Sequence, residues 1–467
     1  MNGVIILSGV WDIHADLHPM HLADDAERRL TTNYTYIFSC KPAYSCCSSG
    51  DHTHGLQTHL RITFSKGDNV MVNEKYYGYG TAPSIIRELF AYGLEQAKKI
   101  GKDKVYDYSL GNPSIPAPVK VNETIKKLVD EESSILLHGY SMAPGFEGTR
   151  EAIAANLRER FNTNAQASEI FMTCGCAPAL VSVACALTCK PEDNFVCIAP
   201  YFPEYNVFFT AGGGKVKVVA ADVPDFQINL EALEATVDEN SVAVVINSPN
   251  NPSGVVYTKE TLEKIGAFLK EKEAEYGHPI YIVADEPYRE LVYGDAKVTF
   301  IPEVYDNTIV CYSWSKSLSL PGERIGYVYV PAKCEDGKAV YAAVAGAARE
   351  IGSVCPPTLI QRVVQECVGC MPDLVAYDEN RNDLYNGLTE MGYECAKPDG
   401  AFYLFMKAPN GDDFAFSEAA KLEENILIVP GSGFQCPGYL RLSYCVSNEM
   451  IKNSMPGFKR LIEKYGK

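Results

Sequence analysis

Three polar residues of types used in catalysis follow closely on apolar runs of this 467-residue chain. Asn251, Asp285 and Lys316 come shortly after the runs 242–246, 280–284 and 308–312. They are about 30 residues apart, which is the length of one strand–helix–strand unit. Because ligands of open parallel sheets bind at the carboxyl ends of the strands, we expect the amide, the carboxylate and the amine to share one cleft.

Lys316 is the residue with the most distinctive chemistry. A lysine at the end of a buried strand is not expected to be a solvated surface charge. Desolvation or a nearby cation would lower the pKa of its amine and make it nucleophilic toward a carbonyl carbon. The cleft is therefore predicted to form a covalent link with a carbonyl compound.

Two segments of the sequence favour an anion site in the same cleft. Arg324 follows Lys316 by eight residues, and together with Ser313 and Ser315 it would suit a phosphate dianion. Upstream, the apolar run 169–173 leads into the small-residue turn 174–177, just before an expected helix. Small residues let backbone N–H groups at a helix start approach an anion. The two segments together predict one phosphate site.

Short apolar runs alternate with helical stretches through the middle of the chain. Runs rich in β-branched residues that are separated by helices predict strands buried on both faces, and hence a largely parallel α/β sheet. The runs are 169–173, 194–198, 215–220, 242–246, 280–284, 308–312 and 326–330, and the helical stretches include 179–187, 258–276 and 338–352.

The two ends of the chain have a different pattern. Residues 84–100 predict an amphipathic helix capped by Ser84, and after residue 362 helices and strands alternate as in a smaller α+β domain. We expect a poorly structured extension over 1–75, an N-terminal arm and part of the small domain over 76–120, a large domain over 121–350 and a small domain over 351–467. A translation start at Met71 is a further hypothesis.

Composition narrows the class of protein. Hydrophobic residues make up 46% and charged residues 22% of the chain, which excludes wholesale disorder. The formal charge of -17 argues against nucleic acid or an anionic membrane as the main partner. Neither a signal peptide nor a membrane anchor is expected. The 16 cysteines are too few for a disulfide scaffold and favour a reducing, cytoplasmic location.

Three motifs of the chain resemble those of a known enzyme family. They are SWSKSLSLPGERIGY (313–327), SPNNPSG (248–254) and DEPY (285–288). In this order and spacing they resemble the fold-type-I pyridoxal phosphate (PLP) enzymes, specifically class I/II aminotransferases of the aspartate aminotransferase superfamily. The resemblance extends from about residue 76 to 467. It implies a mostly parallel, seven-stranded type of sheet in a large PLP-binding domain, a smaller α+β domain, and a homodimer.

The resemblance also implies roles for individual residues around the cofactor. Lys316 would form the internal aldimine and then act as general base. Asp285 would face the pyridine nitrogen, while Tyr288 and Asn251 would bind the ring phenolate oxygen. Phe202 would stack on the ring. The implied phosphate ligands are Ser313, Ser315, Arg324, the turn residues Gly175, Cys176 and Ala177, and Tyr140 reaching across to the partner subunit.

Two further residues are implied in substrate binding. Arg441, in YLRLSY, would bind the substrate α-carboxylate bidentately, with Asn251 beside it. Gly111, in LGNPSIP, belongs to a loop that would close over the substrate. The turn departs from the family pattern, because Cys176 and Ala177 stand where many relatives have serine or threonine. Backbone N–H groups would then hold the phosphate.

The resemblance implies an aminotransferase that moves an amino group between an amino acid and a 2-oxo acid by a ping-pong mechanism through a Lys316 aldimine. A PLP-dependent β-lyase or decarboxylase of the same fold is the open alternative. A ligand-sensing regulator would need a DNA-binding module, and residues 1–70 show no such pattern. No metal site is expected, because Cys367 and Cys370 form a lone CxxC pair.

Overall fold

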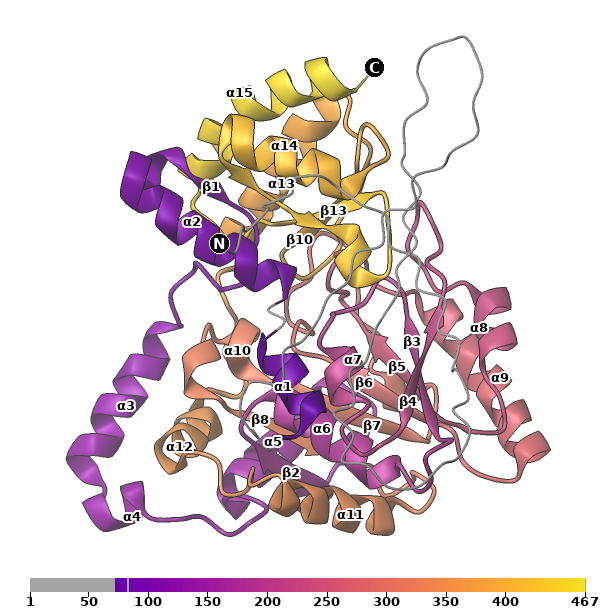
Figure 1. Ribbon diagram of the computed structural model, residues 1–467. Coiled ribbons are helices and arrows are strands. Elements are labelled where there is room, and N and C mark those ends of the chain that lie inside the picture. The colour runs from indigo at the N-terminus through magenta and orange to yellow at the C-terminus, as the bar shows by residue number, and fades with distance from the viewer. Residues whose placement is uncertain (1–71, 82–83, 467) are drawn as a thin grey trace, which may run out of the picture. The chain divides into compact units, whose positions relative to one another are not determined.

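The computed structural model describes residues 72–81 and 84–466, which form parts of two compact units, residues 1–83 and 84–467 (Figure 1). The first unit contributes helix α1 (Glu74–Thr81), none of whose residues is buried. The expectations about residues 1–70 and a start at Met71 lie outside the described residues. All further elements belong to the second unit.

A seven-stranded sheet organises the second unit. Its order is β2-β8-β7-β6-β5-β3-β4. The neighbouring strands β7, β6, β5, β3 and β4 run parallel to one another, whereas β8 runs antiparallel to both of its neighbours, β7 and β2. The predicted mostly parallel sheet is confirmed. The strands are β2 (Ile170–Thr173), β3 (Asn194–Ile198), β4 (Lys215–Val219), β5 (Ser241–Asn247), β6 (Tyr281–Asp285), β7 (Thr308–Ser313) and β8 (Gly326–Tyr329).

Both faces of the central strands are covered. Along β5, Val244 and Ile246 join one hydrophobic core, whereas Ala243 and Val245 join another on the opposite face. This alternation follows from the period of two along a strand. The edge strand β4 is the exception, because Lys215 is exposed and only its last residue is buried, so burial on both faces was wrong there.

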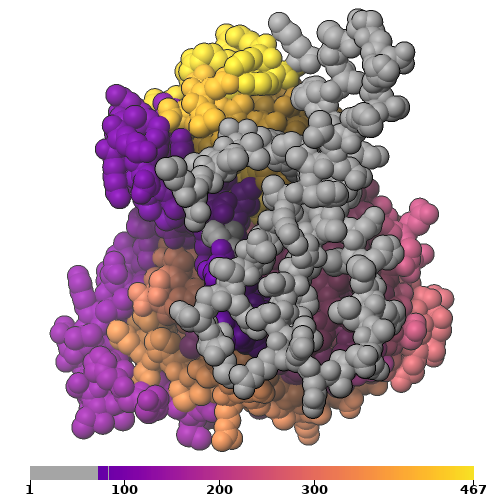
Figure 2. All heavy atoms as spheres, viewed as in Figure 1, coloured from indigo at the N-terminus to yellow at the C-terminus, as the bar shows by residue number. Residues whose placement is uncertain are grey.

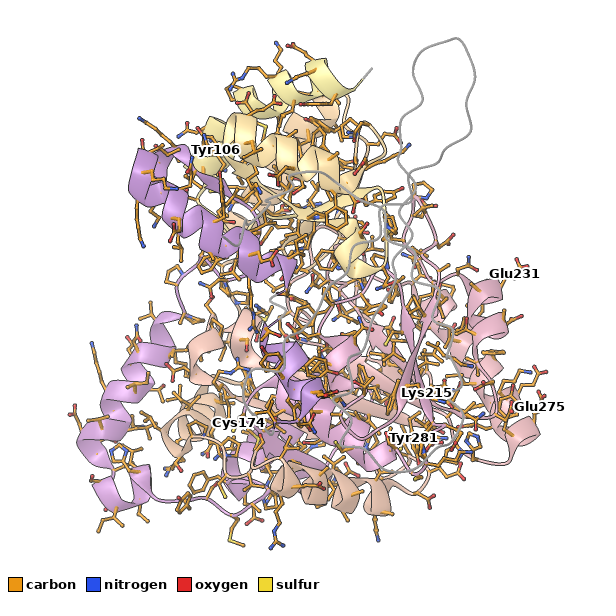
Figure 3. All side chains as sticks on the ribbon, in the orientation of Figure 1. Tyr106, Cys174, Lys215, Glu231, Glu275 and Tyr281 are labelled. Atoms are coloured by element: carbon orange, nitrogen blue, oxygen red, sulfur yellow. The ribbon has the colours of Figure 1, made fainter. Side chains whose placement is uncertain are left out.

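Helices form the two outer layers. One face carries α6 (Cys176–Leu187) and α11 (Gly337–Glu350), which pack on each other, and the short α7 (Tyr205–Phe208). The other core includes residues of α3 (Val119–Glu131), α4 (Ser134–His138), α5 (Glu147–Arg160), α8 (Leu230–Thr236), α9 (Lys259–Tyr276) and α12 (Thr358–Cys367). Glu231 of α8 and Glu275 of α9 are exposed and point away from the sheet (Figure 3).

Helix α12 corrects the predicted domain boundary at residue 351. Its apolar residues Ile360, Val363 and Val364 belong to the core beneath the large sheet, and α12 packs against α3 and α5. The helical spacing of these residues shows that one face is buried. Spacing does not show against which core it is buried, so the assignment of 351–373 to the small domain was wrong for this helix.

A second, smaller group of elements has its own core. Its sheet has the order β12-β13-β10-β9, and β1 pairs with β11 beside it. Tyr403, Leu404 and Leu442 lie in this core. Helix α15 (Asn448–Tyr465), which is coloured yellow in Figure 2, lies at one end of this group. The strands are β1 (Tyr106–Asp107), β9 (Cys395–Ala396), β10 (Tyr403–Lys407), β11 (Ile426–Leu427), β12 (Val429–Pro430) and β13 (Tyr439–Ser443).

The helices of this smaller group come from the beginning and the end of the second unit's sequence. They are α2 (Ile85–Ile100), α13 (Leu374–Glu390), α14 (Asp413–Glu424) and α15 (Asn448–Tyr465). Ser84 occupies the N-cap position of α2 as predicted, but its side chain makes no capping hydrogen bond. In the part of the chain described, no helix combines the length and the apolar character that a membrane span requires.

Short helical turns complete the fold. The turn α10 (Trp314–Ser317) follows β7 directly and carries Lys316. The 3₁₀ turns are η1 (Lys102–Lys104), η2 (Ala167–Glu169), η3 (Ile301–Glu303), η4 (Pro321–Glu323) and η5 (Gly431–Phe434).

Candidate active site

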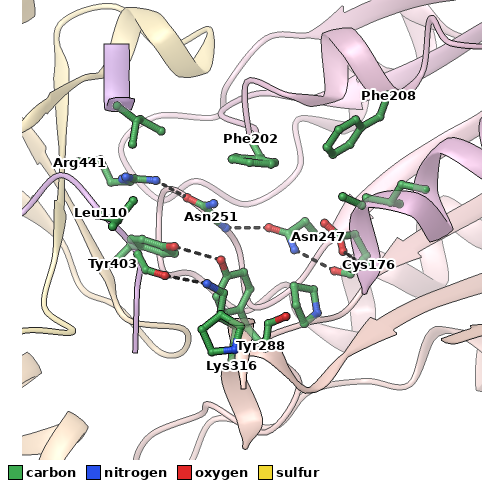
Figure 4. A pocket seen from close by; sticks show the side chains of 18 of the residues that line it. Leu110, Cys176, Phe202, Phe208, Asn247, Asn251, Tyr288, Lys316, Tyr403 and Arg441 are labelled. Atoms are coloured by element: carbon green, nitrogen blue, oxygen red, sulfur yellow. Dashed lines mark hydrogen bonds between the residues drawn. The ribbon is translucent and has the colours of Figure 1, made fainter. Parts of the chain in front are cut away.

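The carboxyl ends of β5, β6 and β7 open into a cavity of about 280 Å³ (Figure 4). Asn247 and Asp285 are paired residues at the ends of β5 and β6. Of the predicted site residues, the cavity is lined by Gly111, Cys176, Ala177, Phe202, Asn251, Asp285, Tyr288, Ser315, Lys316, Arg324 and Arg441. The topology therefore brings together residues spread over 330 positions of the sequence.

The Lys316 amine reaches into this cavity from α10. Its Nζ donates a hydrogen bond to the carbonyl oxygen of Gly111 at 2.7 Å and lies 5.4 Å from the centre of the Phe402 ring. Burial lowers the pKa of Lys316 to about 8, and the positive charges of Arg441 and Arg324 act in the same direction. Near neutral pH a useful fraction of this amine is thus unprotonated and nucleophilic.

Asp285 is a buried carboxylate with a donor on each oxygen. The Cys176 thiol lies 2.9 Å from Oδ1, and the Tyr205 hydroxyl lies 2.5 Å from Oδ2. Burial raises the pKa of Asp285, while both hydrogen bonds oppose that rise. The carboxylate can face a cationic or protonated group across the cavity.

Hydrogen bonds through Asn247 and Asn251 link the backbone of Asp285 to Arg441. Asn247 donates to the backbone carbonyl of Asp285 at 2.8 Å and accepts from the backbone N–H of Asn251 at 2.8 Å. The Asn251 side-chain oxygen accepts from Arg441 Nη1 at 3.1 Å (Figure 4). Arg441 also donates to the carbonyl of Ser109. These contacts orient the guanidinium toward the cavity.

Arg441 is buried without a carboxylate partner among the described residues. Burial lowers the pKa of its guanidinium, and its Nε atom has no hydrogen-bond partner in the part of the chain described. The Tyr403 and Phe434 rings lie 4.7 and 4.9 Å from the guanidinium carbon. A buried guanidinium with donors to spare is suited to bind a carboxylate.

Tyr288 and Gly111 both lie close to the Tyr403 hydroxyl. The hydroxyls of Tyr288 and Tyr403 are 3.1 Å apart. A Cβ atom on Gly111 would lie only 2.0 Å from the Tyr403 hydroxyl oxygen. Glycine at position 111 therefore lets the backbone pass close to Tyr403 and present its carbonyl to Lys316.

The predicted anion site lies at the start of α6. Gly175 has a φ of +92°, and a Cβ atom there would lie 2.8 Å from Arg324 Nη2. Arg324 itself has a φ of +51° and is held by a hydrogen bond from Nη1 to the carbonyl of Pro321. Arg324, Ser315 and Ala177 line this end of the cavity.

Three predicted site residues do not line the cavity within this chain. Gly175 is buried, and Ser313 is also buried and donates to the Ser315 hydroxyl at 3.2 Å. Tyr140 is 96% exposed. Its predicted role in a partner subunit's site stays a prediction.

The sequence reasoning missed several residues that shape the site. Asn247 directly precedes the SPNNPSG motif, so its position beside a strand end was a usable signal. Tyr205 lies two positions past Pro203 on α7, where nothing in the local pattern indicates a contact with Asp285. Tyr403 and Phe208, both cavity-lining, looked like ordinary core aromatics. Among the described residues no group of three or more His, Cys, Asp or Glu could hold a metal ion.

Comparison with known proteins places this chain in a family. Residues 104–455 match the family described as aminotransferase class I and II. The chain is 32% identical over 368 residues to an aspartate aminotransferase of Thermotoga maritima, covering 76% of this chain and 91% of the relative. It is 32% identical over 380 residues to a probable aspartate/prephenate aminotransferase of Aquifex aeolicus, covering 77% and 91%.

Solved structures agree with these matches. An amino transferase from Eubacterium rectale is 53% identical, with a TM-score of 0.84, and the match covers 85% of this chain and all of that one. The aspartate aminotransferase of Thermotoga maritima has a TM-score of 0.74 at 30% identity. The predicted fold and the aminotransferase activity class are thereby confirmed. The chain belongs to the aminotransferase class I and II family, whose members are PLP-dependent enzymes.

Proposed function

We propose that this chain binds PLP covalently through Lys316 and transfers an amino group between an amino acid and a 2-oxo acid. The observation that carries the proposal is the position of the Lys316 amine in one cavity with Asp285, Arg324 and Arg441. A nucleophilic amine, a buried carboxylate and two cations are the groups that such a reaction requires.

The residues present fit the cofactor. The φ of +92° at Gly175 and the guanidinium packed against its Cα leave a side-chain-free cradle for a phosphate at the start of α6. Asp285 would face the ring nitrogen, and Phe202 lines the cavity where a ring would stack. Tyr288 and Asn251 would supply hydrogen bonds to the ring oxygen. When bound, PLP supplies an electron sink for the bond broken at the substrate Cα.

The chain's own residues supply binding and proton transfer. Arg441 would bind the substrate α-carboxylate. Its Nε atom has no partner among the described residues, and Asn251 orients the guanidinium. Lys316 would carry the proton to and from the substrate Cα, because its pKa of about 8 lets the amine act as a base near neutral pH. The ionised Asp285 would hold the ring nitrogen of the cofactor protonated.

We further propose a homodimer in which Tyr140 contributes to the partner's phosphate site. A cluster of apolar side chains around α4 supports this. Ile135, Leu136, Tyr140 and Met142 are all largely exposed in the single chain. Exposed apolar patches of this kind mark interaction sites. A cytoplasmic location is proposed from the free thiols of the described cysteines.

The decisive experiment traps the cofactor on its lysine. The purified protein is loaded with PLP, treated with borohydride and digested. We expect the modified peptide to carry the added mass on Lys316. Lys316→Ala should lose that label and at least a hundredfold in turnover, while Lys297→Ala, an exposed lysine, should keep both. A label elsewhere, or full turnover by Lys316→Ala, would disprove the proposal.

The same preparation separates transamination from lyase chemistry. With an amino donor alone, an aminotransferase converts its cofactor stoichiometrically to the pyridoxamine form and stops. A β-lyase would release ammonia and pyruvate continuously. We expect the stoichiometric conversion and its reversal by a 2-oxo acid.

A further inference from the structure

The thiol of Cys176 makes a side-chain contact that its place in the anion turn does not require. Cys176 is the first residue of α6 and belongs to the turn whose backbone is predicted to hold an anion. Its side chain lies across the cavity end beside Asn247 (Figure 4). There Sγ is 2.9 Å from Asp285 Oδ1. One residue thus connects the phosphate turn with the carboxylate.

The direction of this hydrogen bond follows from the chemistry of its partners. An ionised carboxylate only accepts, so the thiol and the Tyr205 hydroxyl must both donate to Asp285. Burial raises the pKa of the Cys176 thiol and of the Tyr205 phenol well above their usual values, with the nearby Asp285 charge as a further cause. Both groups therefore keep their protons at neutral pH.

Two donors on two oxygens define the orientation of the carboxylate. They come from different helices, α6 and α7, so the carboxylate plane is held from both sides. Among the described residues, the other titratable groups that act on this cluster are Cys197, Glu286, Tyr288 and Cys311, and they offer negative or neutral partners. Cys176 and Tyr205 are therefore the groups that favour the ionised form of Asp285.

We propose that Cys176 is a positioning residue whose S–H, together with the Tyr205 hydroxyl, orients Asp285 and keeps it ionised toward the ring nitrogen of the cofactor. The inference rests on the proposed PLP function and extends it to a side chain for which family resemblance implied only a backbone role. Removal of the donor leaves the carboxylate buried with one hydrogen bond fewer, which favours its neutral form and weakens its hold on a protonated ring nitrogen.

Three variants test the thiol. Cys176→Ala removes the donor, Cys176→Ser replaces it with a hydroxyl, and Cys189→Ala, at an exposed cysteine outside the turn, is the control. Each apoprotein is titrated with PLP to obtain Kd, and each loaded protein is titrated with acid and base to obtain the midpoint of its visible absorption change. Thermal unfolding of the apoproteins checks the fold.

We expect Cys176→Ala to raise the Kd for PLP about tenfold and to move the absorption midpoint by about half a pH unit or more. Cys176→Ser should bring the Kd to within about threefold and the midpoint to within a few tenths of a pH unit of the parent's values, and Cys189→Ala should match the parent. Tyr205→Phe should resemble Cys176→Ala.

The proposal is overturned if Cys176→Ala keeps the parent's Kd and midpoint. It is also overturned if Cys176→Ala and Cys176→Ser are impaired equally, because that result indicates packing and not hydrogen bonding. If the parent protein binds PLP and either of these two results is obtained, only this inference is refuted. A parent that fails to bind PLP refutes the proposed function, and this inference with it.

Discussion

At the level of single residues, the site is defined by charged side chains whose burial costs free energy of folding. Lys316 and Arg441 are both cations with lowered pKa values, and desolvation is the largest cause for each. Neither forms an ion pair with a carboxylate in the part of the chain described. Such groups reduce the stability of the folded apoprotein and become useful when a ligand supplies the missing charge.

Lys316→Met should stabilise the apoprotein at neutral pH. The pKa of Lys316 falls from 10.5 to about 8 on folding, so between these pH values the folded chain binds fewer protons than the unfolded chain. Stability of the parent therefore rises with pH across this window, and the cost of the buried ammonium is largest below pH 8. Allowing for the lost hydrogen bond to Gly111, we expect a gain of about 2 kcal/mol at pH 7.

Urea unfolding of the apoproteins at several pH values measures this gain. The advantage of Lys316→Met over the parent should shrink steadily between pH 8 and pH 10. The exposed Lys297→Met serves as control and should differ from the parent by less than about 0.5 kcal/mol at every pH. A gain that does not change with pH would show that the charge of Lys316 is not its source.

Arg441→Lys should impair substrate binding specifically. The change keeps a positive charge but removes the planar fork that a carboxylate can meet with two hydrogen bonds. We expect kcat/KM for the amino donor to fall roughly 30-fold or more, as for other truncated buried charge pairs, with the Kd for PLP nearly unchanged. Arg349→Lys, an exposed change on α11, is the control. An Arg441→Lys enzyme within twofold of the parent would contradict the role.

At the level of elements, the β2–α6 turn shows how backbone geometry builds a binding site. The chain leaves β2, turns at Gly175 with a positive φ, and starts α6 at Cys176. Gly326 on the neighbouring β8 also approaches this turn, since a Cβ there would lie 3.0 Å from the Gly175 carbonyl carbon. The close approach of two backbones and a guanidinium leaves no space for a side chain at position 175.

Gly175→Ala tests this steric argument, and the chain offers a matched control. Gly175 and Gly213 share a φ of +92°, but a Cβ at Gly213 would meet no atom of the structurally described residues within 4 Å. Each alanine should cost about 1–2 kcal/mol of stability through backbone strain. Only Gly175→Ala should also raise the Kd for PLP, by about tenfold or more, because only there does the Cβ displace Arg324. Equal PLP affinities of the two variants would refute the proposed steric role of Gly175 in phosphate binding.

At the level of the whole second unit, the cavity draws on both groups of elements. Lys316 and Asp285 come from the large sheet, whereas Tyr403 and Arg441 come from β10 and β13 of the small one. Asn251 and Arg441 form a direct hydrogen bond between the two groups. Substrate carboxylate and cofactor would thus be held by different parts of the fold, so their relative placement sets the reaction geometry.

Ile135→Glu should weaken dimerisation if the apolar cluster around α4 is an interface. Ile135 is 84% exposed in the single chain, and a buried glutamate without a partner is costly. Sedimentation velocity should show a dimer for the parent and a shift toward monomer for the variant. Val375→Glu, at an exposed apolar residue of α13, should leave the dimer intact. A monomeric parent, or an Ile135→Glu dimer of unchanged affinity, would contradict the proposal.

The sequence alone was sufficient to predict the seven strands of the large sheet. Apolar runs such as 194–198 correspond to strands because β-branched residues buried on both faces leave few other structures open to them. The order of motifs along the chain placed Asn251, Asp285 and Lys316 at adjacent strand ends for the same local reason.

Only the tertiary structure decided which side chains meet from distant segments. The contacts of Asp285 with Cys176 and Tyr205, of Arg441 with Asn251, and of α12 with the large core join residues whose own neighbours in sequence carry no sign of the partner. Local pattern reports which face of an element is buried. The partner on the other side of that face depends on how all the elements pack together, and a pattern of one element does not contain it.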